Sequence, residues 1–211
     1  MGVRRPTRRA AALGAIGPLL WVACAHLVPG TGRLAECPGA LRATQEIPED
    51  LRLDQRMRIR AKRIDVSMRI VVEKRGGRLV VIGLDPLGAV LFSVVQTGVE
   101  VEIEALPRAV APVPPLNVLR DLHRVRFLSA DVPPDASGRA ESERDGTRIT
   151  EEWIGGALRL RRFARVRGAP RGEIVVAFGA APSGGIARAR IENGWCGYTA
   201  QIDTFVEESL P

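Results

Sequence analysis

Apolar and polar residues alternate along consecutive stretches of this chain, and this period of two restricts the fold more than any other feature. Successive side chains of a β-strand point to opposite faces, so the alternation predicts strands with one apolar face. In the first stretch Met57, Ile59 and Ala61 lie between arginines. In the second stretch, residues 63–73, the apolar side carries Ile64, Val66, Met68, Ile70 and Val72.

The rest of the chain extends this pattern into a sheet. Residues 78–84 and 89–95 are apolar at nearly every position, which predicts central strands covered on both faces. Residues 99–104 alternate again, and further strands are predicted at 147–153, 157–166, 173–178, 186–192 and 195–206, with glycine and proline in the turns. The sequence therefore predicts a mainly β fold, an antiparallel meander of about ten strands.

Helical spacing replaces the period of two at residues 116–128. Val118, Leu119, Leu122 and Val125 fall on one stripe, so we expect one amphipathic helix that packs against the sheet. Residues 129–146 contain two prolines and two glycines and predict a long polar loop.

The N-terminus has the features of an export signal. Four arginines within residues 1–9 precede an apolar stretch, residues 10–28, that is short for a membrane span. We therefore predict a cleaved signal peptide over residues 1–23, followed by a flexible tether over 24–50, where glycine and proline break regular structure, and a β domain over 51–206.

Cys24 is the predicted site of lipidation. The run Leu20-Trp21-Val22-Ala23-Cys24 resembles the lipobox of bacterial lipoproteins, although Trp21 stands where that motif usually has an aliphatic residue. Ordinary signal-peptidase cleavage, giving a secreted or periplasmic protein, and an uncleaved anchor remain alternatives. An aspartate directly after the acylated cysteine resembles an inner-membrane retention signal. Ala25 occupies that position here, so we expect lipid anchoring at the periplasmic face of the outer membrane.

Two further cysteines, Cys37 and Cys196, would remain after acylation of Cys24. Disulfides persist in exported proteins, so we predict that these two pair. Two unrelated buried thiols are the alternative, because the sequence does not fix their separation.

Charge and motifs restrict the function classes. Without the four arginines of the signal, the formal charge falls from +7 to +3, and no basic run with aromatic residues resembles a nucleic-acid surface. The two histidines are His26 in the tether and His123, which we place on an exposed helix face. The sequence has no nucleophile elbow, phosphate loop, dinucleotide fingerprint or Cys-x-x-Cys pair, so we predict no enzyme, no metal, no cofactor and no nucleic-acid partner.

The order of elements resembles that of the LolB-like outer-membrane lipoproteins of the LolA/LolB superfamily. The likeness covers about residues 50–203, including Gly83-Leu84-Asp85-Pro86-Leu87-Gly88 and the closing stretch Ile191-Glu192-Asn193-Gly194-Trp195-Cys196-Gly197-Tyr198. The nearest group is a lipoprotein family of unknown function, with members encoded beside aryl polyene and fatty-acid-type synthesis genes.

This resemblance implies an incomplete barrel around the helix, with an apolar cavity that binds lipid or acyl conjugates for transport or maturation of a hydrophobic envelope product. It also places Leu87 in a loop that protrudes and assists transfer to the membrane, with a leucine folded back over the core as the alternative. The implied cavity lining is Ile64, Val66, Met68, Ile70, Leu79, Val81, Val90, Phe92, Val94, Leu119 and Leu122. A second hypothesis is a non-catalytic assembly lipoprotein that docks an envelope protein partner.

Overall fold

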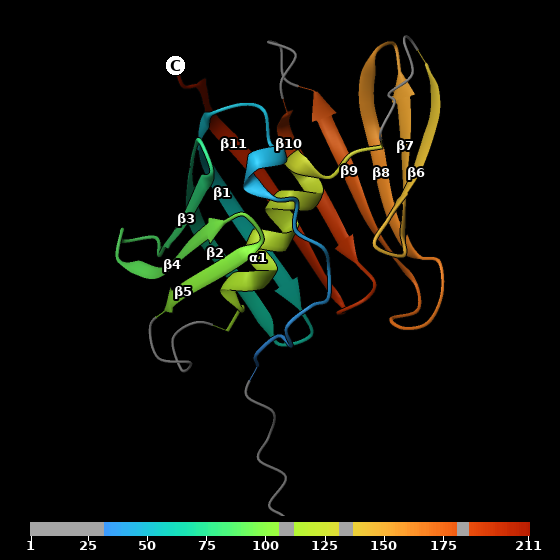
Figure 1. Ribbon diagram of the computed structural model, residues 1–211. Coiled ribbons are helices and arrows are strands. Elements are labelled where there is room, and N and C mark those ends of the chain that lie inside the picture. The colour runs from blue at the N-terminus through green and yellow to red at the C-terminus, as the bar shows by residue number, and fades with distance from the viewer. Residues whose placement is uncertain (1–31, 106–111, 131–136, 181–185) are drawn as a thin grey trace, which may run out of the picture. The chain divides into compact units, whose positions relative to one another are not determined.

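Eleven antiparallel strands form one sheet in the computed structural model, which describes residues 32–105, 112–130, 137–180 and 186–211 (Figure 1). The predicted signal peptide and Cys24 lie outside the described residues. The strands are β1 (Leu51–Ala61), β2 (Ile64–Arg75), β3 (Arg78–Leu84), β4 (Val90–Thr97), β5 (Glu100–Ala105), β6 (Gly138–Arg144), β7 (Thr147–Ile154), β8 (Ala157–Arg165), β9 (Glu173–Ala180), β10 (Ile186–Asn193) and β11 (Tyr198–Ser209).

The strand order is β5-β4-β3-β2-β1-β11-β10-β9-β8-β7-β6. Strands that follow one another in sequence thus pair, except β5 and β6, and β1 pairs with β11 in the middle of the sheet. Within the described residues β5 and β6 do not pair, so the sheet stays open. The prediction of a mainly β, antiparallel, incomplete barrel with a helix is confirmed.

The seam between β1 and β11 joins the two halves of the sheet. Its register runs from Leu51 opposite Ser209 to Arg60 opposite Thr199. The alternation predicted for β1 is visible in its burial, because Leu53, Met57 and Ile59 are buried and the arginines between them are exposed. One face of the seam therefore belongs to the core and the other face meets solvent.

Helix α1 (Pro115–Leu122) lies across the apolar face of the sheet and continues into a π-helical turn, His123–Phe127 (Figure 1). Pro115 occupies the first turn, where the missing N–H costs no hydrogen bond. The predicted stripe, Val118, Leu119, Leu122 and Val125, is buried in the core, which confirms the helix and its orientation.

Residues 32–50, which we call the N-terminal strap, differ from the predicted tether. The strap is packed on the domain, and Leu34, Cys37, Thr44 and Ile47 are buried. Its one regular element is a 3₁₀ turn, Thr44–Glu46. The expectation of a loose segment from 24 to 50 is therefore wrong for residues 32–50, because glycine and proline prevented a helix or strand but not tertiary packing.

Two other details depart from prediction. Strands β3 and β4 lie towards one edge, and one face of each is only half-buried. Strand β6 forms within the stretch predicted as a loop. It pairs with β7 as the last strand of the sheet.

Residues 32–211 form one compact unit. This unit holds every described strand, the buried apolar cluster from Leu34 to Ile202 and the bond between Cys37 and Cys196. A domain that carries its own core is expected to fold by itself.

Candidate functional site

The residues predicted to line an acyl cavity lie mostly in the packed core. Nine of them are buried: Ile64, Met68, Ile70, Leu79, Val81, Phe92, Val94, Leu119 and Leu122. Val66 is half-buried against the same cluster, whereas Val90 has 52% of its surface exposed. Helix α1 and the strap thus fill the concave face with the protein's own side chains.

A pocket opens where β3 separates from β2, and we call it the fork pocket. The pairing of β2 with β3 runs from Arg75 opposite Arg78 to Arg69 opposite Leu84, while residues 64–68 of β2 continue beside β1 alone. The gap has a volume of about 590 Å³. Its lining consists of Arg56, Ser67, Met68, Arg69, Asp85, Pro86, Leu87, Gly88 and Phe205.

Leu87 stands at the rim of the fork pocket on the turn between β3 and β4. The Asp85 carboxylate accepts the N–H groups of Leu87 and Ala89, each at 2.8 Å, and the N–H of Gly88 donates to the Asp85 carbonyl at 3.0 Å. Gly88 has a φ of +88°, which a glycine adopts at little cost. The turn is therefore closed by its own hydrogen bonds, and Leu87 is 94% exposed. Of the two sequence alternatives, the structure has the protruding leucine.

Two arginines, Arg56 and Arg69, line the fork pocket together with the carboxylate of Asp85, which is held by N–H groups of its own turn. Arg69 binds Asp54 through two hydrogen bonds, one of them 2.8 Å long, and this pairing lowers the pKa of the Asp54 carboxyl. Arg56 forms no ion pair with any described residue. Its guanidinium carbon instead lies 5.2 Å from the centre of the Phe205 ring. One cation thus remains available beside an apolar surface.

Phe205 reaches this place through a β-bulge. The register between β1 and β11 shifts between Asp54 and Gln55, so that Asp54 faces Val206 and Gln55 faces Thr204. Phe205 is left without a partner, and its ring is 60% exposed. Bulges commonly redirect a side chain in this way. The sequence prediction named Met68 and Leu87 but missed Arg56, Arg69 and Phe205.

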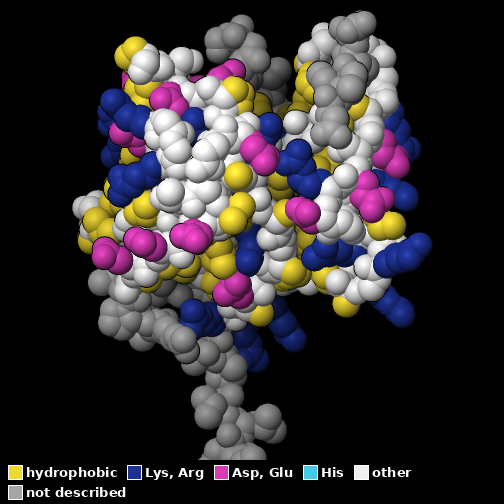
Figure 2. All heavy atoms as spheres, in the orientation of Figure 1, with side chains coloured by type: hydrophobic (Ala, Val, Ile, Leu, Met, Phe, Trp, Pro, Cys, Tyr) yellow, Lys and Arg dark blue, Asp and Glu magenta, His cyan; other side chains and the backbone are white. Residues whose placement is uncertain are grey.

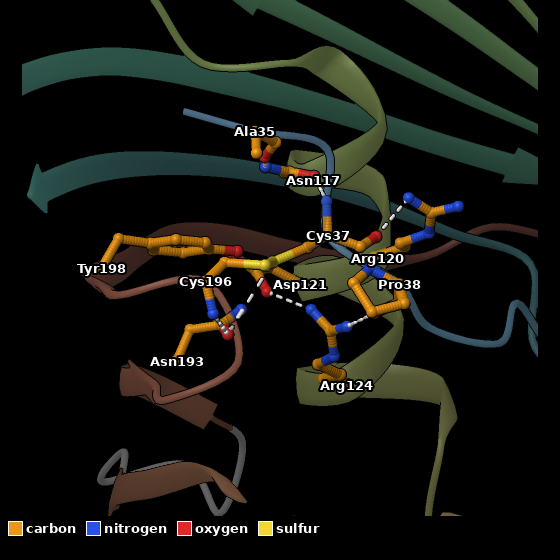
Figure 3. A network of polar contacts seen from close by, with 10 residues as sticks. All are labelled: Ala35, Cys37, Pro38, Asn117, Arg120, Asp121, Arg124, Asn193, Cys196 and Tyr198. Carbon is orange, nitrogen blue, oxygen red and sulfur yellow. Dashed lines mark hydrogen bonds and ion pairs between the residues drawn. A yellow bond between two sulfur atoms is a disulfide. The ribbon is translucent and has the colours of Figure 1, made fainter. Parts of the chain in front are cut away.

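A second, buried cluster attaches the strap to helix α1 (Figure 3). Cys37 and Cys196 are joined in a disulfide with a Cα–Cα distance of 6.0 Å. The N–H of Cys37 donates to Asn117 Oδ1 at 2.7 Å, and Asn117 Nδ2 donates to the Ala35 carbonyl at 2.9 Å. The strap is therefore held by one disulfide and by hydrogen bonds between its backbone and the side chain of Asn117 on the helix.

Charged groups complete this cluster. Arg124 donates to Asp121 Oδ1 and to the Pro38 carbonyl, both at 2.7 Å. Asp121 Oδ2 accepts the hydroxyl of Tyr198 at 2.7 Å. Burial raises the pKa of Asp121, against the opposing effect of Arg124. Because these charged groups are engaged with one another and with the strap, the cluster has the character of a structural network.

His123 is buried, so the prediction of an exposed position is wrong. Its Nδ1 accepts the Arg42 N–H at 3.0 Å, and its Nε2 lies 2.8 Å from Gln96 Oε1. Both contacts fit a neutral ring with the proton on Nε2. Burial and the nearby Arg124 and Arg42 lower the pKa of His123 to about 3. The charged neighbours Asp121 and Arg124 suggested an exposed face, but they pair with each other and are themselves buried.

The described residues contain no group of three or more His, Cys, Asp or Glu side chains arranged to hold a metal ion. No helix within the described ranges has the length and apolar character needed to cross a membrane.

Similar proteins were found by fold and by family. A LolA superfamily protein from Nitrosomonas europaea aligns over 82% of this chain and 96% of its own, with 12% identity and a TM-score of 0.43. A domain from Vibrio parahaemolyticus described as an outer membrane lipoprotein-sorting protein aligns over 76% of this chain and 85% of its own, with 8% identity and a TM-score of 0.41. A comparison with curated protein sequences gave no match.

The match to a family model covers most of the chain. It extends over residues 52–206, from the second residue of β1 to the bulge region of β11, and so includes every strand and α1. The chain therefore belongs to the family described as Protein of unknown function (DUF3261).

Proposed function

We propose that this protein is a lipid-anchored envelope protein that binds lipid or acyl conjugates at the fork pocket. The observation that carries the proposal is the position of Leu87, exposed at the rim of a pocket of about 590 Å³ that also presents Arg56 and Arg69. The binding supports transport or maturation of a hydrophobic envelope product and needs no covalent chemistry. The sequence resemblance extends the proposal to products of aryl polyene or fatty-acid type.

The pocket suits a ligand with an apolar chain and an anionic head. Its volume falls within the range of roughly 300–1,000 Å³ typical of small-molecule sites. Burying each methylene of a guest chain contributes about 0.8 kcal/mol, and Met68, Pro86, Leu87 and Phe205 supply apolar contact. The unpaired guanidinium of Arg56 provides a partner for a carboxylate or phosphate.

The proposed location follows from the N-terminus. We propose that residues 1–23 are a signal peptide and that acylated Cys24 anchors the protein at the periplasmic face of the outer membrane. Mass spectrometry of the mature N-terminal peptide tests this part. An unmodified peptide that begins after residue 23 would leave a secreted or periplasmic protein.

Ligand binding is tested on residues 32–211 by native mass spectrometry with a fatty acid and with the fatty alcohol of the same chain length. We expect the acid to bind more tightly. Arg56→Gln should weaken binding of the acid about tenfold, the effect of losing one charged hydrogen bond, and should leave the alcohol unchanged. Arg52→Gln is the matched control, since Arg52 is an exposed arginine of the same strand outside the fork pocket. Equal effects of the two substitutions would contradict this site.

Delivery is tested separately with Leu87→Glu. Because Leu87 is 94% exposed, the substitution should leave the melting curve unchanged while reducing transfer of bound acyl probe to vesicles. Ile154→Glu is the control, since Ile154 is 62% exposed as the last residue of β7. A large loss of stability in the Leu87 variant would show that the leucine serves the core.

The filled concave face favours a second candidate function. A domain whose own helix and strap occupy that face can act as an assembly lipoprotein that docks an envelope partner. Residues 32–211 that remain empty with both probes, and that bind a specific envelope protein, would support this alternative.

A further inference from the structure

Exposed basic residues gather at one end of the sheet. Lys62 and Arg63 form the turn between β1 and β2, and Arg33 is exposed in the strap close by. The loop between β8 and β9 adds Arg167 and Arg171, also exposed. We call these five residues the basic end. Lys and Arg side chains are visible at the lower end of Figure 2, where Figure 1 shows the turn between β1 and β2.

The antiparallel registers place these loops together. The turn between β1 and β2 lies at the end of the sheet where β10 ends and β11 begins, since Arg60 faces Thr199. The loop between β8 and β9 is at this end as well, because the N–H of Gly194 donates to the Glu173 carbonyl at 3.0 Å. The turn that carries Leu87 follows β3 towards this same end.

The basic end is electrically available to a partner. None of its five members forms an ion pair with a described residue. Three acids nearby are engaged, Asp65 by Arg58 and Arg60, Glu36 by Arg120, and Glu192 by Arg190, while Asp145 in the turn between β6 and β7 is exposed at this end without an ion pair to a described residue. The opposite end carries the exposed acids Glu49, Glu100, Glu207 and Glu208. The basic end therefore carries more unpaired basic than acidic side chains among the described residues.

The chain leaves the described domain at the basic end. A Cβ built on Gly32 would lie 3.0 Å from the Arg63 carbonyl oxygen, so Gly32 packs against the turn between β1 and β2. Cys24 precedes Gly32 by eight residues, and eight residues span at most about 28 Å when fully extended. An anchor at Cys24 is therefore confined to the neighbourhood of this end.

The length of the sheet determines which end of the domain can face the membrane. The 11 residues of β1 extend over about 35 Å, which is longer than the reach from Gly32 to Cys24. The acidic end could not be turned towards a bilayer that holds Cys24, because the tether would have to pass the whole length of β1. The basic end is the one that the tether can bring to the headgroups.

We propose that the basic end docks on the headgroups of an anionic bilayer and orients the domain so that the Leu87 turn faces the membrane. The direction of docking rests on the anchoring given under the proposed function, but the affinity belongs to the domain itself. Each basic residue held near an anionic surface strengthens binding about fivefold, and the attraction acts over a Debye length of about 8 Å at physiological salt.

The test uses residues 32–211, which lack any anchor, in a sedimentation assay with vesicles. Vesicles containing phosphatidylglycerol should bind the domain, vesicles of pure phosphatidylcholine should not, and 1 M NaCl should abolish binding. Lys62→Gln combined with Arg63→Gln should weaken binding to the anionic vesicles roughly 25-fold. The matched control is Arg75→Gln combined with Arg78→Gln, which removes two exposed arginines from the turn between β2 and β3 at the acidic end.

The outcomes separate this inference from the proposed function. Equal binding to both kinds of vesicle, or equal losses in the two double variants, would overturn docking through the basic end. Binding of the fatty-acid probe in solution is measured without vesicles and should be the same in the Lys62 and Arg63 variant as in the unmodified domain. Failure of acyl binding alongside normal vesicle docking would remove the fork-pocket proposal and leave the docking surface intact.

Discussion

Acidification should destabilise this domain through His123. The buried ring has a pKa lowered to about 3, whereas an exposed histidine in the unfolded chain titrates near 6.5. Between pH 6.5 and about pH 3 the histidine is therefore protonated in the unfolded state and neutral in the folded state. A group with a depressed pKa contributes stability above its unfolded pKa and loses that contribution as the pH falls towards its folded pKa. The affected window is pH 6.5 down to about 3.

The size of the effect follows from the same linkage. Between pH 7 and pH 5 the free energy of unfolding should fall by about 2 kcal/mol, at a slope approaching 1.4 kcal/mol per pH unit. The geometry explains why the folded state resists protonation. A proton added at Nδ1 would face the N–H of Arg42, which already donates to that nitrogen.

Urea unfolding of residues 32–211 at a series of pH values measures this slope, since His123 is the one histidine of that range. His123→Gln should be less stable at pH 7 but should lose the histidine component of the slope. Burial raises the pKa of Asp121, which has the opposite sign: it adds stability at low pH that is lost as the pH rises. This contribution is common to both proteins and cancels in their difference. Equal pH slopes for the two proteins would refute the buried neutral histidine.

Three further substitutions test the packing of the domain. Cys196→Ser opens a disulfide with a sequence separation of 159 and should lower the free energy of unfolding by about 5 kcal/mol, measured by urea unfolding without reductant. Gly83→Ala would place a Cβ 2.3 Å from the Phe92 ring and should cost about 1–3 kcal/mol, part of which Phe92→Leu should restore. Arg161→Ala leaves the buried carboxylate of Glu151 without its partner at 2.6 Å and should cost about 3–5 kcal/mol, whereas a buried arginine without a structural role would cost far less.

The alternation of apolar and polar residues predicted most of the strands, because a strand with one face in the core and one face in solvent alternates in this way. The strands of the seam are examples. The same signal failed for β6, an edge strand in which Ala140 is the buried residue and polar side chains occupy both faces. The strap failed for a different reason. Leu34 and Cys37 are three residues apart, but Pro38 and Gly39 interrupt this spacing and Ile47 does not continue it, so the burial of the strap depends on contacts with distant elements.

The candidate site was predictable in part. Leu87 could be identified from the resemblance and its turn chemistry, since Asp85 and Gly88 close the turn locally. Arg56 and Phe205 are about 150 residues apart, and a register shift between the first and last strands brings them together. Such a shift has no local sequence signal, because it depends on pairing between strands that are not neighbours in the chain.

The central position of the β1 and β11 seam has a consequence for how the chain acquires its fold. A polypeptide made from its N-terminus exposes β1 early, but the partner of Leu51 is Ser209, nearly the last residue. Until β11 has been made, one edge of β1 stays unpaired and β1–β5 remain a separate meander. Closure of the seam, and with it the joining of the two halves of the sheet, therefore waits for β11.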